Sequence, residues 1–363
     1  MESRLKLRSL IMLFASYFSS ALIAATFAIV VSPIASTAEL SVDALANYQG
    51  ADRRQRMIEG AKKEGILNLY TSLTVEDMNV LNAAFEKAYG IKVRMWRAAC
   101  DKVLQRVLAE HQAGRAEVDI IECNAPPLEA MHREGVLQAV RSPWHAELIA
   151  AAVPNHREWA GTRLNVFVHA YNTKLVKKEE LPKTYADLLD PRWKGRLSIE
   201  ATDDDWFASV VRGLGEDKGV KLFRDIVSQN GMTVRRGHTL LTNLVASGEV
   251  PFALTVYNFT AEQVKQKGAP LDWFVLSPAV ARANGVALAK RSPHPHAALL
   301  YYDFMIGDEG QQILFKRDFV PTSRKIDTPL NRGPLVIIDP ALVLDESDKW
   351  ARRYEDIFVK QIK

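Results

Sequence analysis

Apolar residues along this chain recur with two different spacings, and these spacings alternate from about residue 66 onward. Residues 66–70 are short and almost continuously apolar, as expected for a strand that is buried on both faces. In Val75–Tyr89 the apolar positions recur every three or four residues, which predicts a helix that ends at Gly90. Residues 91–95 alternate between apolar and charged, and 118–121 are again apolar. This order predicts a parallel sheet with helices on its faces.

The same alternation resumes after Thr162, and it extends the prediction over the rest of the chain. The predicted strands are 165–170, 197–200, 232–234, 252–256, 273–276 and 285–289. The predicted helices are 185–189, 204–214, 217–229, 239–247, 260–267, 296–306 and 309–315.

The length of the chain and its lack of a glycine-serine linker predict two α/β lobes that are joined directly. With 363 residues the chain is too long for one compact core, so two lobes hinged by crossing strands are expected. We predict that each lobe holds a mostly parallel sheet flanked by helices. The predicted parts are lobe 1 (39–164, returning at 285–330), lobe 2 (165–284) and a C-terminal helical tail (331–363).

The first 38 residues have a different character from the rest of the chain. Three basic residues at positions 4, 6 and 8 precede an apolar run over 10–31, and Pro33 ends this run. The small residues at 36–38 then match a signal-peptidase site, so we predict a signal peptide that is cut after about Ala38 and a periplasmic location. An uncleaved anchor is the alternative, because the run is long enough to cross a bilayer. No cysteine stands at the cut, so no lipid anchor is expected.

Charge and cysteine content narrow the function further. The chain has a net charge of +4, of which the leader supplies +2, and so weak a balance does not indicate a nucleic-acid partner. Cys100 and Cys123 are either a disulfide or two free thiols, and the sequence favours neither. No nucleotide-binding glycine loop, nucleophile elbow or H-E-x-x-H pair is present, so no catalytic residue is predicted.

Candidate ligand-binding residues follow from the predicted strand order. Open parallel sheets bind ligands beyond the carboxyl ends of their strands, and two such sheets that face each other form a cleft. The candidates are therefore the residues at strand ends and helix starts, with two aromatic side chains as cleft walls. They are Thr71, Ser72, Arg97, Glu122, Asn124, Asp203, Asp204, Trp206, His238, Tyr257 and Asn258.

The most distinctive local feature is the run of three aspartates at 203–205. Capping and the helix dipole explain at least one of them, and simple capping with solvation is one interpretation of all three. Under the other interpretation, the surplus charge repels anions and, with Glu122 and Glu200, suits a cation, an amine or a metal. Arg97 and Arg236 would add the second charge type that a zwitterionic ligand needs.

Six stretches, in the right order along the chain, resemble the type II periplasmic solute-binding proteins of ABC importers, and specifically their ferric-iron-binding branch. The stretches are LYTS (69–72), AFEKAYGIKV (84–93), AEVDI (116–120), YNTKLV (171–176), LLDPRWKGR (188–196) and GVALAK (285–290). The resemblance implies an exported monomer that captures a small molecule or a metal ion and delivers it to a permease and its ATPase. It implies no cofactor other than a metal ion as ligand.

The resemblance also indicates where metal ligands would lie. Ferric-binding members use a histidine after the first strand, a glutamate after the third, and two adjacent tyrosines. Here those positions hold Thr74, Asn124 and 258–259 (Asn-Phe), so the chain departs from the pattern. The candidate metal ligands of a shifted site are Glu122, His238 and Tyr257. An organic cation or zwitterion is the alternative ligand, and a sensor subunit or an enzyme on the same fold is the alternative function.

Overall fold

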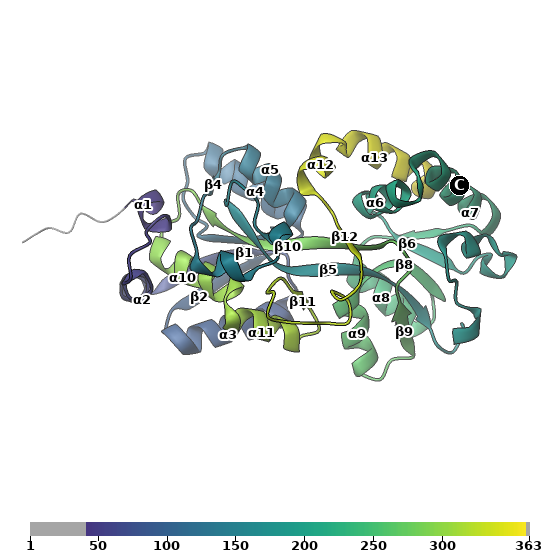
Figure 1. Cartoon of the computed structure of the whole chain (residues 1–363), viewed down its shortest axis with the longest axis horizontal. Helices are drawn as coiled ribbons and strands as arrows, with labels where there is room; N and C mark the ends of the chain where they lie inside the picture. The colour runs from purple at the N-terminus through teal and green to yellow at the C-terminus, as the bar shows by residue number, and fades with distance from the viewer. Residues whose placement is uncertain (1–40, 361–363) are drawn as a thin grey trace, which may run out of the picture. The chain divides into compact units, whose positions relative to one another are not determined.

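The computed structural model of the chain describes residues 41–360, which form an α/β structure built on one mixed sheet (Figure 1). Eight strands follow one another across this sheet: β2 (Lys92–Arg97), β1 (Ile66–Thr71), β3 (Ile120–Asn124), β10 (Ala279–Ala289), β5 (Trp159–Asn172), β8 (Phe252–Tyr257), β6 (Leu197–Glu200) and β7 (Thr233–Arg235). Four others pair beside them: β4 (Leu137–Gln138) and β12 (Leu335–Ile337) with β10, and β9 (Leu271–Phe274) and β11 (Val320–Pro321) with β5.

Two long strands cross from one half of the sheet to the other. The first part of β5 pairs antiparallel with β10, and its last part pairs with β8 and β9. Strand β10 in turn pairs antiparallel with β3, so the hydrogen-bonded ladder is continuous. At Gly285 the two crossing strands approach so closely that an added Cβ would lie 2.6 Å from the carbonyl oxygen of Ala160. The predicted crossing strands are present, and they make one sheet of the two halves.

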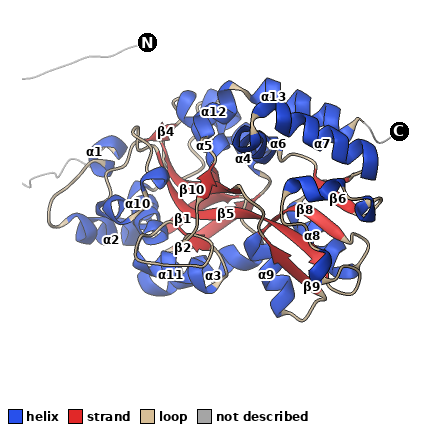
Figure 2. Cartoon of the chain, turned by 45° about the vertical axis from the view of Figure 1, so that its right-hand side comes forward, coloured by secondary structure: helices blue, strands red, loops and turns tan. Residues whose placement is uncertain are grey.

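The two halves that these strands join each contain parallel strands, as predicted. In the first, β1 pairs parallel with β2 and β3, and in the second, β6 pairs parallel with β7 and β8. We call the first half, with its helices, the first lobe: α1 (Val42–Ala46), α2 (Arg53–Glu64), α3 (Val75–Tyr89), α4 (Cys100–Gln112), α5 (Ala125–Arg133), α10 (Pro295–Ile306) and α11 (Asp308–Lys316). The second lobe has α6 (Asp204–Leu214), α7 (Glu216–Asn230), α8 (His238–Ser247) and α9 (Asn258–Gln266). Helices flank the strands in both lobes (Figure 2).

Both crossing strands begin earlier than predicted. The predicted strands 165–170 and 285–289 are only the later parts of β5 and β10. Their first parts contain polar side chains that are nevertheless buried, among them Thr162, Arg163, Arg282 and Asn284. A pattern of apolar residues cannot assign such positions to a buried strand. Because both strands are shared by the two halves, the predicted lobe boundaries stay predictions.

Three further elements differ from the prediction. Helix α5 was not expected, since Pro126 and Pro127 interrupt the pattern, but proline fits the first turn of a helix. The helix predicted at 185–189 is a 3₁₀ helix, Tyr185–Leu189. The predicted helical tail contains β12 before its helices α12 (Pro340–Asp345) and α13 (Ser347–Tyr354) and a π-helical turn over Glu355–Val359.

The C-terminal helices bridge the two lobes. Helix α12 contacts α5 of the first lobe, where Arg133 pairs with Asp345 at 2.7 Å. Helix α13 packs on α6 of the second lobe, and there Trp350, Tyr354 and Phe358 are buried against other aromatic rings. Figure 1 shows this segment in yellow, running from α5 to α6.

The predicted signal peptide lies outside the described residues. Within 41–360, no helix is long and apolar enough to cross a membrane.

The aromatic cluster of the second lobe generates a stability prediction. Phe207 is fully buried and contacts the rings of Phe223, Trp350, Tyr354 and Phe358. We expect Phe207→Ala to lower the free energy of unfolding by about 3–5 kcal/mol, because it removes a buried ring and leaves a cavity between the neighbouring aromatic rings. Chemical denaturation measures this change.

The matched control is Phe315→Ala, because the Phe315 side chain is 42% exposed. Its cost should stay below about 1 kcal/mol. Equal costs for the two variants would show that the aromatic cluster does not hold the C-terminal helices.

Candidate functional site

A cavity of about 870 Å³ opens between the two lobes. Its walls come from the segments that follow β1, β2 and β3 in the first lobe and β6, β7 and β8 in the second. Its remaining surface includes side chains of the crossing strands, such as Arg163 on β5 and Arg282 on β10. The carboxyl ends of strands from both lobes therefore converge on one space, as binding sites of open parallel sheets do.

The structure brings six of the eleven candidate residues to this cavity. These are Ser72, Arg97, Asn124, Asp204, His238 and Tyr257. The other five are buried behind its surface: Thr71, Glu122, Asp203, Trp206 and Asn258.

Two of the buried candidates, Trp206 and Asn258, make their contacts within the protein and do not line the cavity. The interpretation of Trp206 as a cleft wall is wrong, because its ring is 1% exposed and packs edge-on against Tyr185 and Phe223. Asn258 accepts a hydrogen bond from the backbone N–H of Val166 at 3.1 Å and donates one to the carbonyl oxygen of Asp318 at 3.0 Å. Its amide thus ties the start of α9 to neighbouring backbone.

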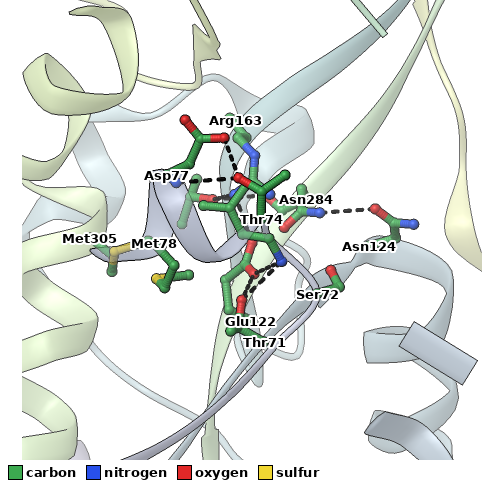
Figure 3. A network of polar contacts seen from close by, with 12 residues as sticks. Thr71, Ser72, Thr74, Asp77, Met78, Glu122, Asn124, Arg163, Asn284 and Met305 are labelled. Carbon is green, nitrogen blue, oxygen red and sulfur yellow. Dashed lines mark hydrogen bonds and ion pairs between the residues drawn. The ribbon is translucent and has the colours of Figure 1, made fainter. Parts of the chain in front are cut away.

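Glu122 is committed to a buried ion pair. Nη1 of Arg163 lies 2.6 Å from its Oε1, and the hydroxyl of Thr71 donates to its Oε2 at 2.5 Å. Figure 3 shows Thr71 and Glu122 side by side on neighbouring strands, with Asn284 reaching toward Asn124. Since Arg163 and Thr71 occupy both oxygens of Glu122, the hypothesis that it is a metal ligand is not supported by this arrangement.

Arg282 pairs with two of the three aspartates in the run 203–205. Its Nε donates to Oδ2 of Asp205 at 2.7 Å, and its Nη2 lies 3.3 Å from Oδ1 of Asp203. Its Nη1 donates to the hydroxyl of Tyr257 at 2.5 Å. The two carboxylates at 203 and 205 are therefore not free, since both contact the same guanidinium. Asp203 occupies the N-cap position of α6, but its side chain makes no capping hydrogen bond.

Asp204 is the member of the run that faces the cavity without a cation of its own. Burial, reinforced by the neighbouring Asp205, raises its pKa to about 6. Burial also opposes ionisation of Asp203, but His238 and Arg282 outweigh it and lower the pKa of that carboxyl. The run thus contains one carboxyl with a lowered pKa, Asp203, next to one with a pKa raised to about 6, Asp204.

His238 and Glu200 complete the second-lobe side of the site. The His238 ring lies 3.8 Å from the Tyr257 ring, centroid to centroid, and its Nε2 lies 3.3 Å from Oδ1 of Asp203. Oε1 of Glu200 accepts from the backbone N–H of Gly237 at 2.8 Å, at the start of α8. Ligand atoms of Glu200, Asp203 and His238 lie within 4.8 Å of one another, so these three residues could hold a metal ion.

Several buried polar atoms at the cavity have no hydrogen-bond partner among the described residues. They are Nε of Arg163, Oδ1 of Asn165, Nδ1 of His238 and Oδ1 of Asn284, which line the cavity, and Oδ2 of Asp203 behind it. Buried polar groups are seldom left unpaired, so each of these atoms needs a partner such as water or a ligand.

The charges that line the cavity are mixed. The basic residues are Arg97, Lys102, Arg163, Arg236 and Arg282, and the acidic residues are Asp101, Glu200, Asp204 and Asp205. Such a cavity suits a ligand that carries both signs of charge. Cys100 also lines it at the start of α4, with Cys123 buried on β3, and both are free thiols in this structure.

Sequence reasoning missed Arg163, Asn165, Arg282 and Asn284 as site residues. All four lie on the crossing strands, in or next to the parts of β5 and β10 that the apolar pattern did not assign. A signal was nevertheless present in the sequence, because two arginines and two asparagines interrupt otherwise apolar segments there. Charged side chains are buried only with partners, so such residues indicate a paired, functional or structural, polar cluster.

Comparisons with known proteins agree with this geometry. A family model described as a bacterial extracellular solute-binding protein matches residues 118–338. Iron uptake protein A1 of Synechocystis is 27% identical over 273 residues, which cover 70% of this chain and 74% of that protein.

Two solved structures share the fold. Iron-bound HitA from Pseudomonas aeruginosa has a TM-score of 0.70 and 22% identity, with 80% of this chain and 99% of that one covered. The periplasmic binding protein AfuA from Actinobacillus pleuropneumoniae, with fructose-6-phosphate bound, has a TM-score of 0.70 and 22% identity, with 81% and 99% covered. The likeness establishes the two-lobed fold of type II periplasmic binding proteins that the sequence predicts.

The raised pKa of Asp204 generates a prediction about pH. An aspartate in an unfolded chain titrates near 3.8, so ionising Asp204 in the folded protein costs stability as the pH rises from about 4 through 6. Asp204→Asn should therefore stabilise the unliganded protein by about 1–3 kcal/mol at pH 7.5 and have little effect at pH 4. Melting curves of both proteins at the two pH values measure this difference. A gain of the same size at both values would contradict the shifted ionisation.

Proposed function

The chain belongs to the family of bacterial extracellular solute-binding proteins, and from this membership we propose that it captures a small ligand in the cavity and delivers it to the permease of an ABC importer. The resemblance found in the sequence is thereby confirmed at the level of the family. The observation that carries the proposal is the cavity itself, where the strand ends of both lobes and the two crossing strands place polar and charged side chains around one space. Such a site suits reversible capture between two lobes that close on their ligand.

The proposed place of action is the periplasm. Family members are extracellular or periplasmic, and the predicted signal peptide would export this chain, with cleavage after about Ala38. The partners are the permease and its ATPase, which would take the ligand from a monomeric binding protein. Binding rather than catalysis is supported by relatives that are named for iron uptake and iron binding.

The proposed ligand is iron(III) carried by a small organic anion. Iron is supported by the names of the relatives, and Tyr257, His238 and Asp204 are the side chains at the cavity that suit it. A bare ferric ion, however, would meet Arg282, whose Nη1 already lies 2.5 Å from the hydroxyl of Tyr257. A polycarboxylate on the metal removes this conflict, because its oxygens can accept from the guanidinium groups.

The departure from the usual ferric site supports a complex instead of a bare ion. Where ferric-binding members have two adjacent tyrosines, this chain has Asn258 and Phe259 after Tyr257. With fewer protein oxygens available, the remaining metal ligands would come from the organic anion. Arg97 and Arg236, one from each lobe, are free of the buried ion pairs and are placed to hold it.

Direct binding measurements test the ligand. Isothermal titration of the mature protein should give one site for ferric citrate, and at least about tenfold weaker binding of citrate alone, since the metal contributes its own bonds. Ferric iron in a complex with a chelator other than citrate should also bind more weakly than ferric citrate. Citrate binding as tightly as its iron complex would reject iron as the ligand.

A second candidate ligand is an organic phosphate. It is favoured by the arginines of the cavity and by the fold shared with AfuA, whose structure contains fructose-6-phosphate. The same titration therefore includes fructose-6-phosphate and an amino acid as a zwitterion. Tight binding of either, with no binding of ferric citrate, would keep the capture function and replace the ligand.

One substitution tests the metal contact specifically. Tyr257→Phe removes a single hydroxyl, so it should weaken ferric citrate binding about tenfold or more and leave citrate binding nearly unchanged. Tyr89→Phe is the matched control, because Tyr89 does not line the cavity. An unchanged ferric citrate affinity in Tyr257→Phe would place the metal elsewhere in the site.

A further inference from the structure

Four side chains with metal-ligating chemistry gather on the first lobe, and none of them lines the cavity between the lobes. Glu129 and His132 come from α5, and His156 and Glu158 come from the segment that leads into β5. All four are mostly buried, with side-chain exposures between 10% and 29%. Two imidazoles and two carboxylates are a common ligand set for zinc and related divalent ions.

The four side chains form a connected series of contacts from Glu129 through His156 and His132 to Glu158. Nε2 of His156 lies 3.1 Å from Oε2 of Glu129, and Nδ1 of His132 lies 2.9 Å from Oε2 of Glu158. The two imidazole rings stack in parallel, with centroids 3.7 Å apart and planes 10° from each other. Ligand atoms of Glu129, His132 and His156 all lie within 4.8 Å of one another. Ligand atoms on one tetrahedral zinc are roughly 3.3–3.5 Å apart, so metal binding requires the two imidazoles to rotate out of their parallel stack until their nitrogens point at one ion.

Two backbone segments, α5 and the turn at Arg157, position the four side chains. Glu129 and His132 are three residues apart on α5, a spacing that puts them on the same helix face. Between His156 and Glu158, Arg157 has a positive φ of 55°, a strained conformation for a residue other than glycine. That turn leaves the side chains on either side of it in contact with α5. Strain of this kind is concentrated at functional sites.

Among the described residues, one cation outside the cluster lies within ion-pair distance of it. Two carboxylates lie against two imidazoles, and the nearest cation, Nε of Arg133, is 4.0 Å from Glu129 and also serves Asp345. The contact between His132 and Glu158 lacks the geometry of a hydrogen bond, so Nδ1 and Oε2 are buried without a hydrogen-bond partner among the described residues. A divalent cation would satisfy both atoms.

The indole of Trp159 supports the carboxylate that would be the central ligand. Its Nε1 donates to Oε2 of Glu129 at 3.2 Å, which fixes the orientation of that carboxylate in the way an outer partner fixes a metal ligand. His156 makes one competing contact, since its Nδ1 accepts from the backbone N–H of Glu158 at 3.1 Å. Metal binding at Nε2 moves the ring proton to Nδ1 and breaks that hydrogen bond.

We propose that Glu129, His132 and His156 bind one divalent transition-metal ion of the zinc type, with Glu158 as the fourth ligand. The ion would link α5 to the segment that enters crossing strand β5, and would thus brace the first lobe behind the cavity. This site is separate from the cavity and does not depend on the function proposed for it.

Zinc ion alone is the probe, offered to the mature chain without a histidine tag. Competition with a chromophoric chelator should give one site per chain that is lost in the double variant His132→Ala/His156→Ala. The loss of zinc affinity should exceed the roughly 10- to 100-fold that follows when a residue hydrogen-bonded to a metal ligand is removed. Cobalt in place of zinc should give the visible absorption of a tetrahedral site, and the double variant should abolish it.

The matched control is His238→Ala, because His238 belongs to the other candidate metal group, in the cavity. It should keep the zinc site intact. If His238→Ala loses zinc binding and the double variant keeps it, the ion binds in the cavity and the proposal is wrong.

A conservative variant guards against misfolding. Glu129→Gln keeps the size of the side chain and should weaken zinc binding about tenfold or more with an unchanged circular dichroism spectrum. At the same zinc concentration, the rise in melting temperature should be smaller for Glu129→Gln than for the parent, as expected for weaker binding of a ligand that binds only the folded state. Equal zinc affinity in Glu129→Gln and the parent would overturn the proposal.

Discussion

Neutralising two buried arginines in the middle of the sheet is the constraint on which the rest of the structure depends. Arg163 on β5 is 1% exposed and Arg282 on β10 is 7% exposed. A guanidinium does not lose its proton in a protein, so each needs a carboxylate at the same depth. Glu122 on β3 serves Arg163, and Asp203 and Asp205 at the start of α6 serve Arg282. Each ion pair therefore ties a crossing strand to one of the two lobes, and removing one partner would leave a buried charge that costs about 3–5 kcal/mol.

This pairing decides which groups remain available at the cavity. Glu122, Asp203 and Asp205, which the sequence presents as acidic surplus, pair with buried arginines. Asp204, His238, Arg97 and Arg236 line the cavity. The cavity is therefore lined by both acidic and basic side chains, and neither sign of charge is alone there. Its chemistry matches a ligand with metal or cationic character at one end and anionic oxygens at the other.

The sequence predicts the fold well and the site only in part. Alternating strand and helix periods locate β1, α3, β6 and α6 closely, because their buried positions are apolar. The same logic finds the strand ends that carry Ser72, Asn124 and His238. It fails on β5 and β10, where buried arginine and asparagine side chains have partners distant in sequence, such as Glu122 for Arg163 and Asp205 for Arg282. It also places Trp206 at the surface of the cleft, since a residue at the start of a helix has the same pattern whether its side chain turns outward or into an aromatic cluster.

The C-terminal helices are attached to the two lobes by bonds of different strength. On the second lobe, Trp350 and Tyr354 are buried among aromatic rings, and the Tyr354 hydroxyl donates to the carbonyl oxygen of Glu200 at the end of β6. On the first lobe the attachment is a solvent-exposed ion pair between Arg133 and Asp345, with a hydrogen bond from Arg133 to Ala341. Exposed ion pairs contribute at most about 1 kcal/mol, far less than a buried aromatic cluster. A rotation of one lobe against the other would therefore be expected to break the contact between α12 and α5 before the contact between α13 and α6.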